Sequence, residues 1–249
     1  MIKVLINGCN GKMGQEVAKS VLQTPDIETL CGFDKIAFGD NNFPVFTNVS
    51  EINLIPDVII DFSIPEATFT ILEFAVKNKI PTVIATTGFS HEEILKIKEY
   101  SKIIPIFMSS NMSYEINLMS KLLADLATKL PNTDIEIIET HHNRKIDSPS
   151  GTALLLANSI NEALNNEMTY EYNRHSKREK RNKKEIGIHS IRGGNEVGKH
   201  TVIFFGENES FEITHNVSSR GVFADGAIKA AFYLLAQPEG FYNMNNLLK

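Results

Sequence analysis

A polar stretch near the middle of the chain, residues 139–147 (ETHHNRKID), groups side chains that can carry protons and bind anions. Adjacent histidines in a strand point to opposite faces, but a loop can turn both toward one ligand. His141 and His142 are therefore candidates for contact with a substrate. Lys145 offers a cation and a transferable proton. The combination indicates capture of an anion together with proton transfer.

The same stretch runs into a helix start at Ser150-Gly151-Thr152. Hydroxyl groups and the N–H groups of a first helical turn suit a carboxylate, so we expect these residues to bind an acidic group of a substrate. A metal site is the weaker interpretation, because no further histidine, cysteine or acid falls at helical ligand spacing. We expect no metal. A polar surface loop that only caps a helix is the remaining alternative.

A second candidate site is the glycine turn of residues 8–14 (GCNGKMG), which follows a strand-like run and opens a helical pattern. Glycines let the backbone approach a pyrophosphate, and the helix start that follows favours the anion. The spacing is G-x-x-G-x-x-G, with Asn10 in the middle, and is a weak signal alone. Asp34 lies 34 − 14 = 20 residues after Gly14. An acid there can accept hydrogen bonds from ribose hydroxyls of a dinucleotide.

Lys35 follows Asp34 directly. An acid repels the extra 2′-phosphate of NADP, whereas a lysine attracts it, so the pair predicts tolerance of both NADH and NADPH. Residues 85–88 and 109–112 follow two later strand-like runs and could complete the site, because ligands of open parallel sheets lie beyond the carboxyl ends of the strands. Ordinary loops are the alternative for both segments.

Strand and helix patterns alternate through the first hundred residues, which favours a parallel sheet with right-handed crossovers. The expected strands are 3–7, 28–33, 57–61, 82–86 and 103–108, with helices starting near 12, 65 and 91. Ser63 and Ser90 each stand three residues before a glutamate and are expected to cap the second and third of these helices.

The pattern changes after about residue 111. Expected elements there are a helix over 114–130, a strand over 134–140, a helix over 151–164, strands over 186–191, 200–205 and 210–217, and a helix over 223–236. Strands in succession indicate a mixed or antiparallel sheet in a second domain. The basic run 174–185 (RHSKREKRNKKE) is expected to be a solvated, mobile loop.

Composition limits the class of protein. The 249 residues suffice for one large domain or two modest ones, and the net charge of −5 argues against a nucleic-acid partner. Cys9 and Cys31 have no metal-ligand spacing and are expected to be reduced thiols. The first residues lack a signal-peptide pattern, and no run approaches the roughly 18 apolar residues of a membrane span. We therefore expect a cytoplasmic protein with no membrane contact.

Several motifs together resemble the dihydrodipicolinate reductase family. They are GCNGKMG, ATTGF, SSNMS, ETHHNRKIDSPSGTA, IGIHSIRGGNEVGKHTV and SSRGVFADGAIKAAFYLL, which cover nearly the whole chain. The block from the paired histidines to Ser-Gly-Thr is the specific part, whereas glycine turns are common. Lys12 stands where the family often has arginine, which leaves the cofactor preference open.

The resemblance implies an α/β fold of two domains. A doubly wound, Rossmann-like parallel-sheet domain of residues 1–112 and 221–249 would bind the dinucleotide, and an α+β domain with a mixed sheet, 113–220, would serve substrate binding and oligomerisation. The implied enzyme is a cytoplasmic homotetramer of lysine/diaminopimelate biosynthesis. It reduces a cyclic, unsaturated imine dicarboxylate to tetrahydrodipicolinate with NADH or NADPH.

The resemblance also implies roles for single residues. His141 would be the catalytic acid/base and Lys145 a proton donor, and which of them delivers the decisive proton stays open. The implied substrate-binding residues are His142, Ser150, Gly151, Thr152 and Arg220, and for Arg220 a surface or interdomain ion pair is the alternative. The implied cofactor-binding residues are Gly8, Cys9, Asn10, Gly11, Lys12, Met13, Asp34, Lys35, Ala85, Thr86, Thr87, Ser109, Ser110, Asn111 and Met112.

Two other functions are weighed against this one. The first is another two-domain NAD(P)-dependent dehydrogenase, and a version like aspartate-semialdehyde dehydrogenase would need a catalytic cysteine in the second domain. Both cysteines lie within the first 31 residues, which disfavours that version. The second is a non-catalytic nucleotide-sensing module. Such a module need not keep His141, His142 and Lys145, so their joint presence favours an enzyme.

Overall fold

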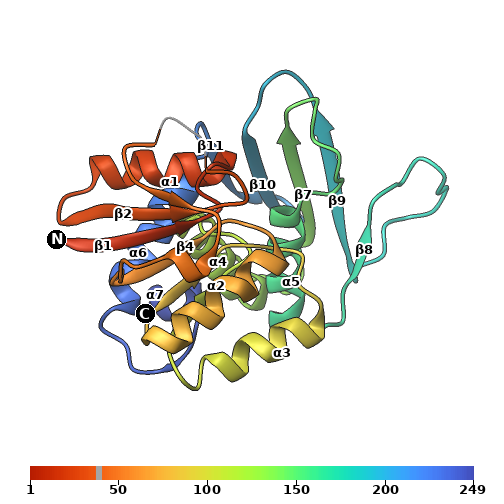
Figure 1. Ribbon diagram of the computed structural model, residues 1–249. Coiled ribbons are helices and arrows are strands. Elements are labelled where there is room, and N and C mark those ends of the chain that lie inside the picture. The colour runs from red at the N-terminus through yellow and green to blue at the C-terminus, as the bar shows by residue number, and fades with distance from the viewer. Residues whose placement is uncertain (38–40) are drawn as a thin grey trace. The chain divides into compact units, whose positions relative to one another are not determined.

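The computed structural model describes residues 1–37 and 41–249. Within this part the chain divides into two compact units. Unit 1 comprises Met1–Tyr114 and Arg220–Lys249, and unit 2 comprises Glu115–Ser219. Each unit is built around one sheet (Figure 1).

Unit 1 contains a seven-stranded sheet in the order β12-β6-β5-β4-β1-β2-β3, with every pair parallel. Its strands are β1 (Ile2–Asn7), β2 (Ile27–Phe33), β3 (Val45–Phe46), β4 (Val58–Asp61), β5 (Thr82–Ile84), β6 (Pro105–Met108) and β12 (Gly240–Tyr242). The strand order reverses between β1 and β4, which is where doubly wound sheets bind ligands. The predicted doubly wound parallel sheet is confirmed.

Alternate residues of β1 supply two cores, one on each face of the sheet. Val4 and Ile6 pack with α1 and α6, whereas Leu5 packs with α2 and α3. The helices of unit 1 are α1 (Lys12–Gln23), α2 (Pro65–Asn78), α3 (His91–Tyr100), α6 (Gly221–Leu234) and α7 (Met244–Leu247), with a 3₁₀ turn at Val49–Glu51. Helix α6 comes after unit 2 in the chain, yet its buried residues complete the core of the unit 1 sheet.

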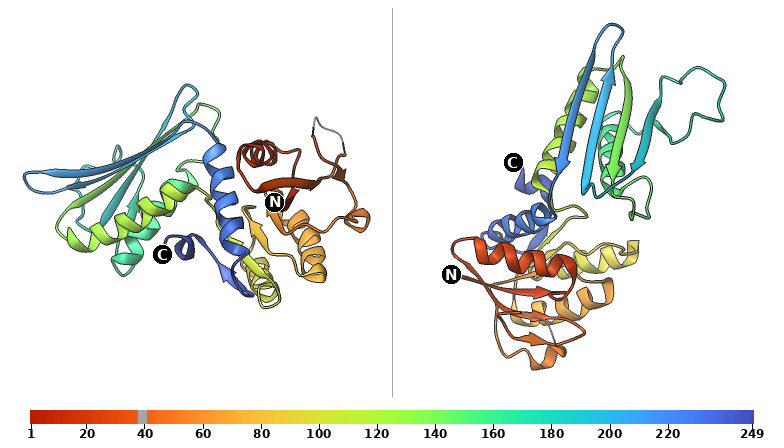
Figure 2. Two further views of the ribbon diagram at one scale, coloured as in Figure 1. Left: turned by 90° about the vertical axis from the view of Figure 1, so that its left-hand side faces the viewer. Right: turned by 90° about the horizontal axis from the view of Figure 1, so that it is seen from above.

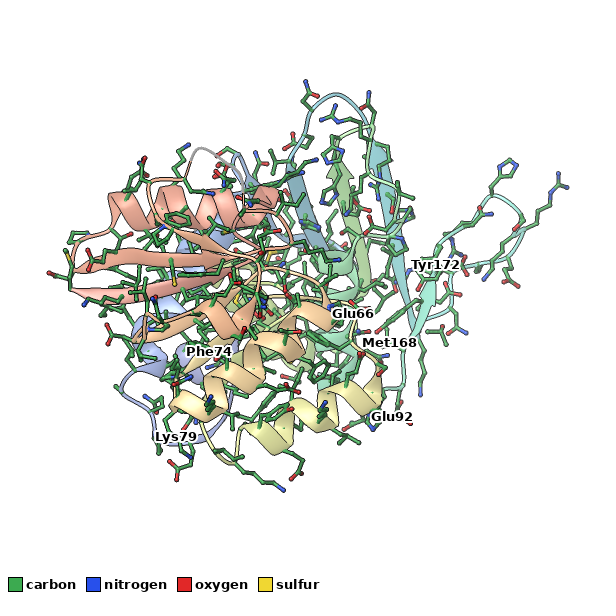
Figure 3. The ribbon with its side chains drawn as sticks, in the orientation of Figure 1. Glu66, Phe74, Lys79, Glu92, Met168 and Tyr172 are labelled. Carbon is green, nitrogen blue, oxygen red and sulfur yellow. The ribbon has the colours of Figure 1, made fainter. Side chains whose placement is uncertain are left out.

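The two expected serine caps have different outcomes. Ser90 accepts the N–H of Glu93, whose carboxylate accepts the N–H of Ser90, so this capping box is confirmed. The prediction for Ser63 is wrong, because the cap position of α2 is Ile64 and no side chain caps it. The Ser63 hydroxyl donates to Asp61 instead. At its other end α2 is followed by Lys79, which is labelled in Figure 3. The backbone of Lys79 is left-handed, with φ 59°.

Unit 2 contains a five-stranded sheet in the order β11-β10-β7-β9-β8. Its strands are β7 (Asp134–His141), β8 (Thr169–Glu171), β9 (Glu185–Arg192), β10 (Gly198–Phe205) and β11 (Ser210–Val217). β7 runs parallel to β9 and antiparallel to β10, so the predicted mixed sheet is confirmed. The helices α4 (Tyr114–Lys129) and α5 (Gly151–Ala163) lie on one face of this sheet (Figure 2).

The helix-covered face of this sheet is apolar at one end and polar at the other. Along β7 every second residue is buried. Ile135 and Ile137 join the apolar core with α4 and α5, and the next two on the same face are Glu139 and His141. β10 shows the same change, because Val202 lies in the core and His200 at the polar end. The alternation therefore places polar side chains at one end of an otherwise apolar layer.

The basic run 174–185 is not uniformly solvated, so that prediction is wrong for part of the run. Glu185 is only 8% exposed and begins β9. The Arg181 side chain is only 16% exposed and lies 3.0 Å from both Asp134 and Glu136. It also donates to the carbonyl of Ile135 at 2.9 Å. The acidic partners belong to the start of β7, far away in sequence, so the charge pattern alone did not reveal them. Figure 3 labels Tyr172, where this loop leaves β8.

Short elements were not predicted. β3, β8, β12 and α7 have two to four residues each, which is too few for a periodic pattern to appear. In the described ranges no helix is long and apolar enough to cross a membrane.

A buried polar cluster joins the carboxyl ends of β1 and β4. Asp61 is fully buried and accepts hydrogen bonds from Asn7 Nδ2 at 2.8 Å, Ser63 Oγ at 2.5 Å and Thr68 Oγ1 at 2.6 Å. Burial raises the pKa of Asp61, although the hydrogen bonds oppose that shift. The cluster lies directly after the strands that flank the reversal of strand order.

Replacing Asp61 tests this cluster. Asp61→Ala leaves buried donors without an acceptor and is expected to cost about 2–4 kcal/mol, whereas Asp61→Asn keeps the shape and is expected to cost about 1 kcal/mol or less. Because the pKa of Asp61 is raised in the folded state, Asp61 ionises at lower pH in the unfolded chain, above about pH 4. Wild type should therefore lose stability as the pH rises, relative to Asp61→Asn, which has no ionisable group at this position. Denaturant unfolding at about pH 5 and about pH 8 measures both effects. Equal losses in the two variants would contradict the expectation.

Candidate active site

A buried carboxylate, Glu139, is the centre of the polar end of the unit 2 sheet. Its side chain is 0% exposed. Arg192 on β9 donates to both carboxylate oxygens at 2.8 Å, which is the planar two-point geometry that guanidinium favours. His141 Nδ1 lies 2.5 Å from Oε2, and the backbone N–H of Ser150 donates to Oε1 at 3.1 Å. Two strands and a helix start therefore converge on one side chain.

The hydrogen bonds determine the charge of Glu139. Burial alone would raise its pKa, but hydrogen bonds from Arg192, Ser190 and His141 outweigh burial and lower the pKa to about 2. The same ion pair raises the pKa of Arg192. Both partners are thus charged throughout the physiological pH range.

His200 connects the sheet to helix α5. Its Nε2 lies 3.0 Å from Ser150 Oγ, which also accepts the N–H of Ala153 as the N-cap of α5. Burial, followed by the nearby charge of His141, lowers the pKa of His200 to about 4. His200 is therefore neutral, and its contact with Ser150 helps to fix the start of α5.

The loop after β7 is held by its own neighbours. The His142 N–H donates to the carbonyl of Glu196 at 2.7 Å. Lys145 Nζ lies 2.8 Å from Asp147 Oδ1, and the hydrogen bond from Lys145 lowers the pKa of Asp147. Arg192 Nη2 donates to the carbonyl of Asp147 at 2.7 Å. The guanidinium that holds Glu139 therefore also anchors the loop that carries Lys145.

These contacts bring most of the predicted substrate-site residues into one region of unit 2. His141 and Ser150 bind Glu139 directly, and Lys145 lies on the loop anchored by Arg192. The half-buried His142 follows His141, while Gly151 and Thr152 form the first turn of α5. Arg220 is not in this group, because it is exposed at the N-cap of α6 and belongs to unit 1.

Three residues of this group, Glu139, Arg192 and His200, were not predicted as site residues from the sequence. A signal for Glu139 was present, because two-residue alternation along the strand puts it on the same buried face as His141. No local signal existed for the other two. Arg192 reaches Glu139 only through the pairing of β7 with β9, and His200 only through the pairing of β7 with β10.

The glycine turn of unit 1 has the geometry of a close backbone approach. Gly8 has φ +79°, and a Cβ there would lie 2.5 Å from the carbonyl oxygen of Phe62. A Cβ on Gly14 would lie 2.1 Å from the carbonyl oxygen of Gly8. The N-cap of α1 is Gly11, and no side chain caps the helix. The turn therefore offers backbone N–H groups at a helix start, which fits a dinucleotide phosphate.

Asp34 is tied to this turn. Its Oδ2 accepts the N–H of Asn10 at 2.9 Å, and its Oδ1 accepts the N–H of Lys35 at 2.7 Å. The carboxylate at the end of β2 is thereby held beside the glycine turn. The side chain of Cys9 is buried, and burial raises its pKa to about 12, so Cys9 offers only its backbone to a ligand.

The other predicted cofactor residues follow β1, β5 and β6 at the carboxyl edge of the sheet. Exposed positions are Gly11, Lys12, Thr87 and Ser110; half-buried ones are Met13, Ser109 and Asn111; buried ones are Ala85, Thr86 and Met112. The Thr86 hydroxyl accepts the N–H of Ser63 at 2.8 Å, which connects the ends of β4 and β5. Across residues 1–37 and 41–249 no group of three or more metal-ligating side chains is present.

Two family models match the chain in sequence. The model described as dihydrodipicolinate reductase, N-terminus, matches residues 2–112, and the model for the C-terminus of the same family matches residues 115–248. The chain belongs to the dihydrodipicolinate reductase family. The resemblance seen in the motifs is confirmed.

Relatives match along the full length. The chain is 49% identical to the 4-hydroxy-tetrahydrodipicolinate reductase of Caldanaerobacter subterraneus subsp. tengcongensis, covering 100% of this chain and 99% of the relative. It is 47% identical to that of Clostridium tetani, covering 100% and 97%. A dipicolinate-bound dihydrodipicolinate reductase from Paenisporosarcina sp. TG-14 has a TM-score of 0.84 at 27% identity, covering 98% and 99%. A myo-inositol dehydrogenase from Corynebacterium glutamicum, at 15% identity, shares the fold with a TM-score of 0.64 over 100% and 92%.

The depressed pKa of His200 predicts a loss of stability in acid. The unfolded chain takes up a proton near pH 6.5, which the folded His200 accepts only near pH 4. Stability is therefore complete above pH 6.5 and falls as pH decreases toward 4, by up to about 3 kcal/mol. His200→Gln should flatten this dependence, while the exposed His91→Gln should keep it. Denaturant midpoints across this pH range give the answer, and an unchanged slope in His200→Gln would refute the assignment.

Proposed function

We propose that this protein is a 4-hydroxy-tetrahydrodipicolinate reductase of lysine/diaminopimelate biosynthesis, using NADH or NADPH. The observation that supports the chemistry best is the group in unit 2, where a histidine held by a buried carboxylate lies beside a lysine loop and a helix start. That group suits an anionic substrate that must receive a proton. Full-length similarity to curated reductases of this name supports the same substrate.

In this proposal unit 1 binds the dinucleotide. The turn of residues 8–13 receives the pyrophosphate, and Asp34 with Lys35 contacts the adenosine ribose. Residues 85–87 and 109–112 line the remainder of the cofactor site at the same edge of the sheet. A bound nicotinamide dinucleotide supplies the hydride that reduces the conjugated imine.

Unit 2 binds the substrate. The first turn of α5, with Gly151 and Thr152, binds one carboxylate through N–H and hydroxyl groups. Ser150 positions this turn, because its N–H donates to Glu139 and its hydroxyl lies against His200. His142 contributes a further polar contact, and Arg220 is proposed as a partner for a substrate carboxylate. The dipicolinate named in the Paenisporosarcina structure is a dicarboxylate, which agrees with a site built for two acidic groups.

The protein completes the reduction with a proton. Hydride addition breaks the π bond of the conjugated double bond and leaves an electron pair shared by the neighbouring carbon and the imine nitrogen. One proton then bonds to that carbon and neutralises the negative charge. Lys145 and His141 are the proposed donors. The lysine cation also stabilises the developing negative charge, and its ion pair with Asp147 holds it in the loop until substrate binds.

We also propose a homotetramer in the cytoplasm, assembled through the sheet of unit 2. The sheet face opposite α4 and α5 exposes Ile191 and Phe205, at 51% and 43%. Burying such apolar residues against another copy is favourable. Sedimentation velocity should give a tetramer, and a monomer at micromolar concentration would contradict this assembly.

The activity is tested by following NADH and NADPH absorbance while dihydrodipicolinate synthase generates the substrate in place. Wild type should turn over. Lys145→Ala and His141→Ala should each lose about a hundredfold or more in kcat while still binding cofactor. Arg144→Ala is the matched control. Arg144 lies on the same loop as Lys145, but its side chain is exposed and donates to Asn195 Oδ1 in the turn between β9 and β10. If wild type binds cofactor but never oxidises it with this substrate, the proposed function is wrong.

A further inference from the structure

One ring nitrogen of His141 is committed to a carboxylate. Nδ1 lies 2.5 Å from Glu139 Oε2, and the ionised Glu139 can only accept a hydrogen bond. Nδ1 must therefore carry a proton. When the ring is neutral, its lone pair is then on Nε2.

Glu139 cannot turn away from His141. Both of its oxygens are bound by Arg192, and one is also bound by the N–H of Ser150. Arg192 is itself fixed by its bond to the carbonyl of Asp147. The carboxylate thus has one position, and it determines the orientation of the imidazole.

The opposite side of the imidazole lies against Gly198 at the start of β10. A Cβ at residue 198 would lie 3.0 Å from His141 Nε2 and 3.4 Å from Cδ2. The ring cannot retreat without breaking its bond to Glu139. The φ of Gly198 is outside the positive range that requires glycine, so the space beside Nε2 is the physical reason for a glycine here.

Charged and titratable side chains around the His141 imidazole come from four strands and from the loop after β7. They are Glu139 on β7, Arg192 on β9, His200 on β10, His215 beside it on β11, and Lys145 with Asp147 on the loop. His200 meets the ring edge-on with centroids 5.1 Å apart and is neutral. Glu139 is the anion in direct contact with the imidazole.

We infer that Glu139, locked by Arg192, and Gly198 are positioning residues that make Nε2 of His141 the nitrogen that exchanges a proton in the reaction. The inference rests on the proposed function and extends it to residues that act only through His141. Glu139 sets the orientation and the tautomer of the ring, and Gly198 keeps its working nitrogen uncovered.

Glu139→Gln removes the charge and keeps the size. It should lower kcat by tenfold or more with KM changed by less than about threefold, because the loss falls on the proton transfer step. Glu139→Asp restores the charge and should recover part of kcat, which a purely structural role for Glu139 would not predict.

Gly198→Ala is the second test variant. It is needed because Glu139→Gln weakens the contacts of the buried Arg192 guanidinium, which by itself destabilises the fold. The added methyl group should lower kcat by about tenfold or more through contact with Nε2, with cofactor binding and melting temperature near those of wild type. Gly193→Ala is the matched control in the turn between β9 and β10, because a Cβ there meets nothing within 4 Å. It should behave as wild type.

The outcomes separate this inference from the proposed function. If wild type is active and His141→Ala is impaired, but Glu139→Gln and Gly198→Ala keep the wild-type kcat, the positioning role is overturned and the reductase assignment stands. If wild type never oxidises cofactor with the substrate, both are overturned. A selective kcat loss in Gly198→Ala but not in Gly193→Ala supports the inference.

Discussion

The ion pair between Glu139 and Arg192 is the interaction on which the polar end of unit 2 depends. Withdrawing a lone carboxylate from water costs several kcal/mol, so it stays ionised inside a protein only when partners surround it. Here the partners come from a neighbouring strand, from the same strand and from the first turn of α5. Each partner is thereby constrained, and the elements that carry His141, Ser150 and the Lys145 loop are held together around one charge.

Unit 1 uses a different constraint at the corresponding end of its own sheet. There the backbone comes so close to itself that Gly8 and Gly14 have no room for a side chain. The buried Asp61 cluster joins the strand ends beside that turn. Backbone N–H groups at a helix start suit a phosphate in unit 1, whereas ionised side chains suit proton transfer in unit 2. The two units therefore present different kinds of group, which is the division of roles that the proposed function needs.

Much of the fold was predictable because it depends on local patterns. Buried strands such as β4, the helix period of α1 and the capping box of Ser90 can all be read within a few residues. The residues between His141 and Thr152 were proposed as site residues from type and spacing, and they lie in one region of unit 2. The failure at Ser63 is local, because its hydroxyl bonds Asp61 two residues earlier and not the helix start. The failure at Arg181 is not local, because its partner Glu136 is 45 residues away in sequence.

The core of the site was less predictable for the same reason. Arg192 is 53 residues from Glu139 in sequence, and only the parallel register of β7 and β9 makes them neighbours. Gly198 carries no functional group, and its importance appears only when the distance to His141 is known. Spacing reveals which side chains can do chemistry, whereas sheet register determines which residues orient them.

The most direct test is nitrogen-15 NMR of the histidine side chains, with the His141 signals assigned by comparison with His141→Asn. The ion pair described here predicts a proton on Nδ1 at neutral and at alkaline pH, hydrogen-bonded to Glu139, and a bare Nε2 once the ring is neutral. Glu139→Gln should lose that preference. A neutral His141 with the proton on Nε2 and a bare Nδ1 in the wild-type protein would contradict the account, because a carboxylate 2.5 Å away cannot donate to that nitrogen.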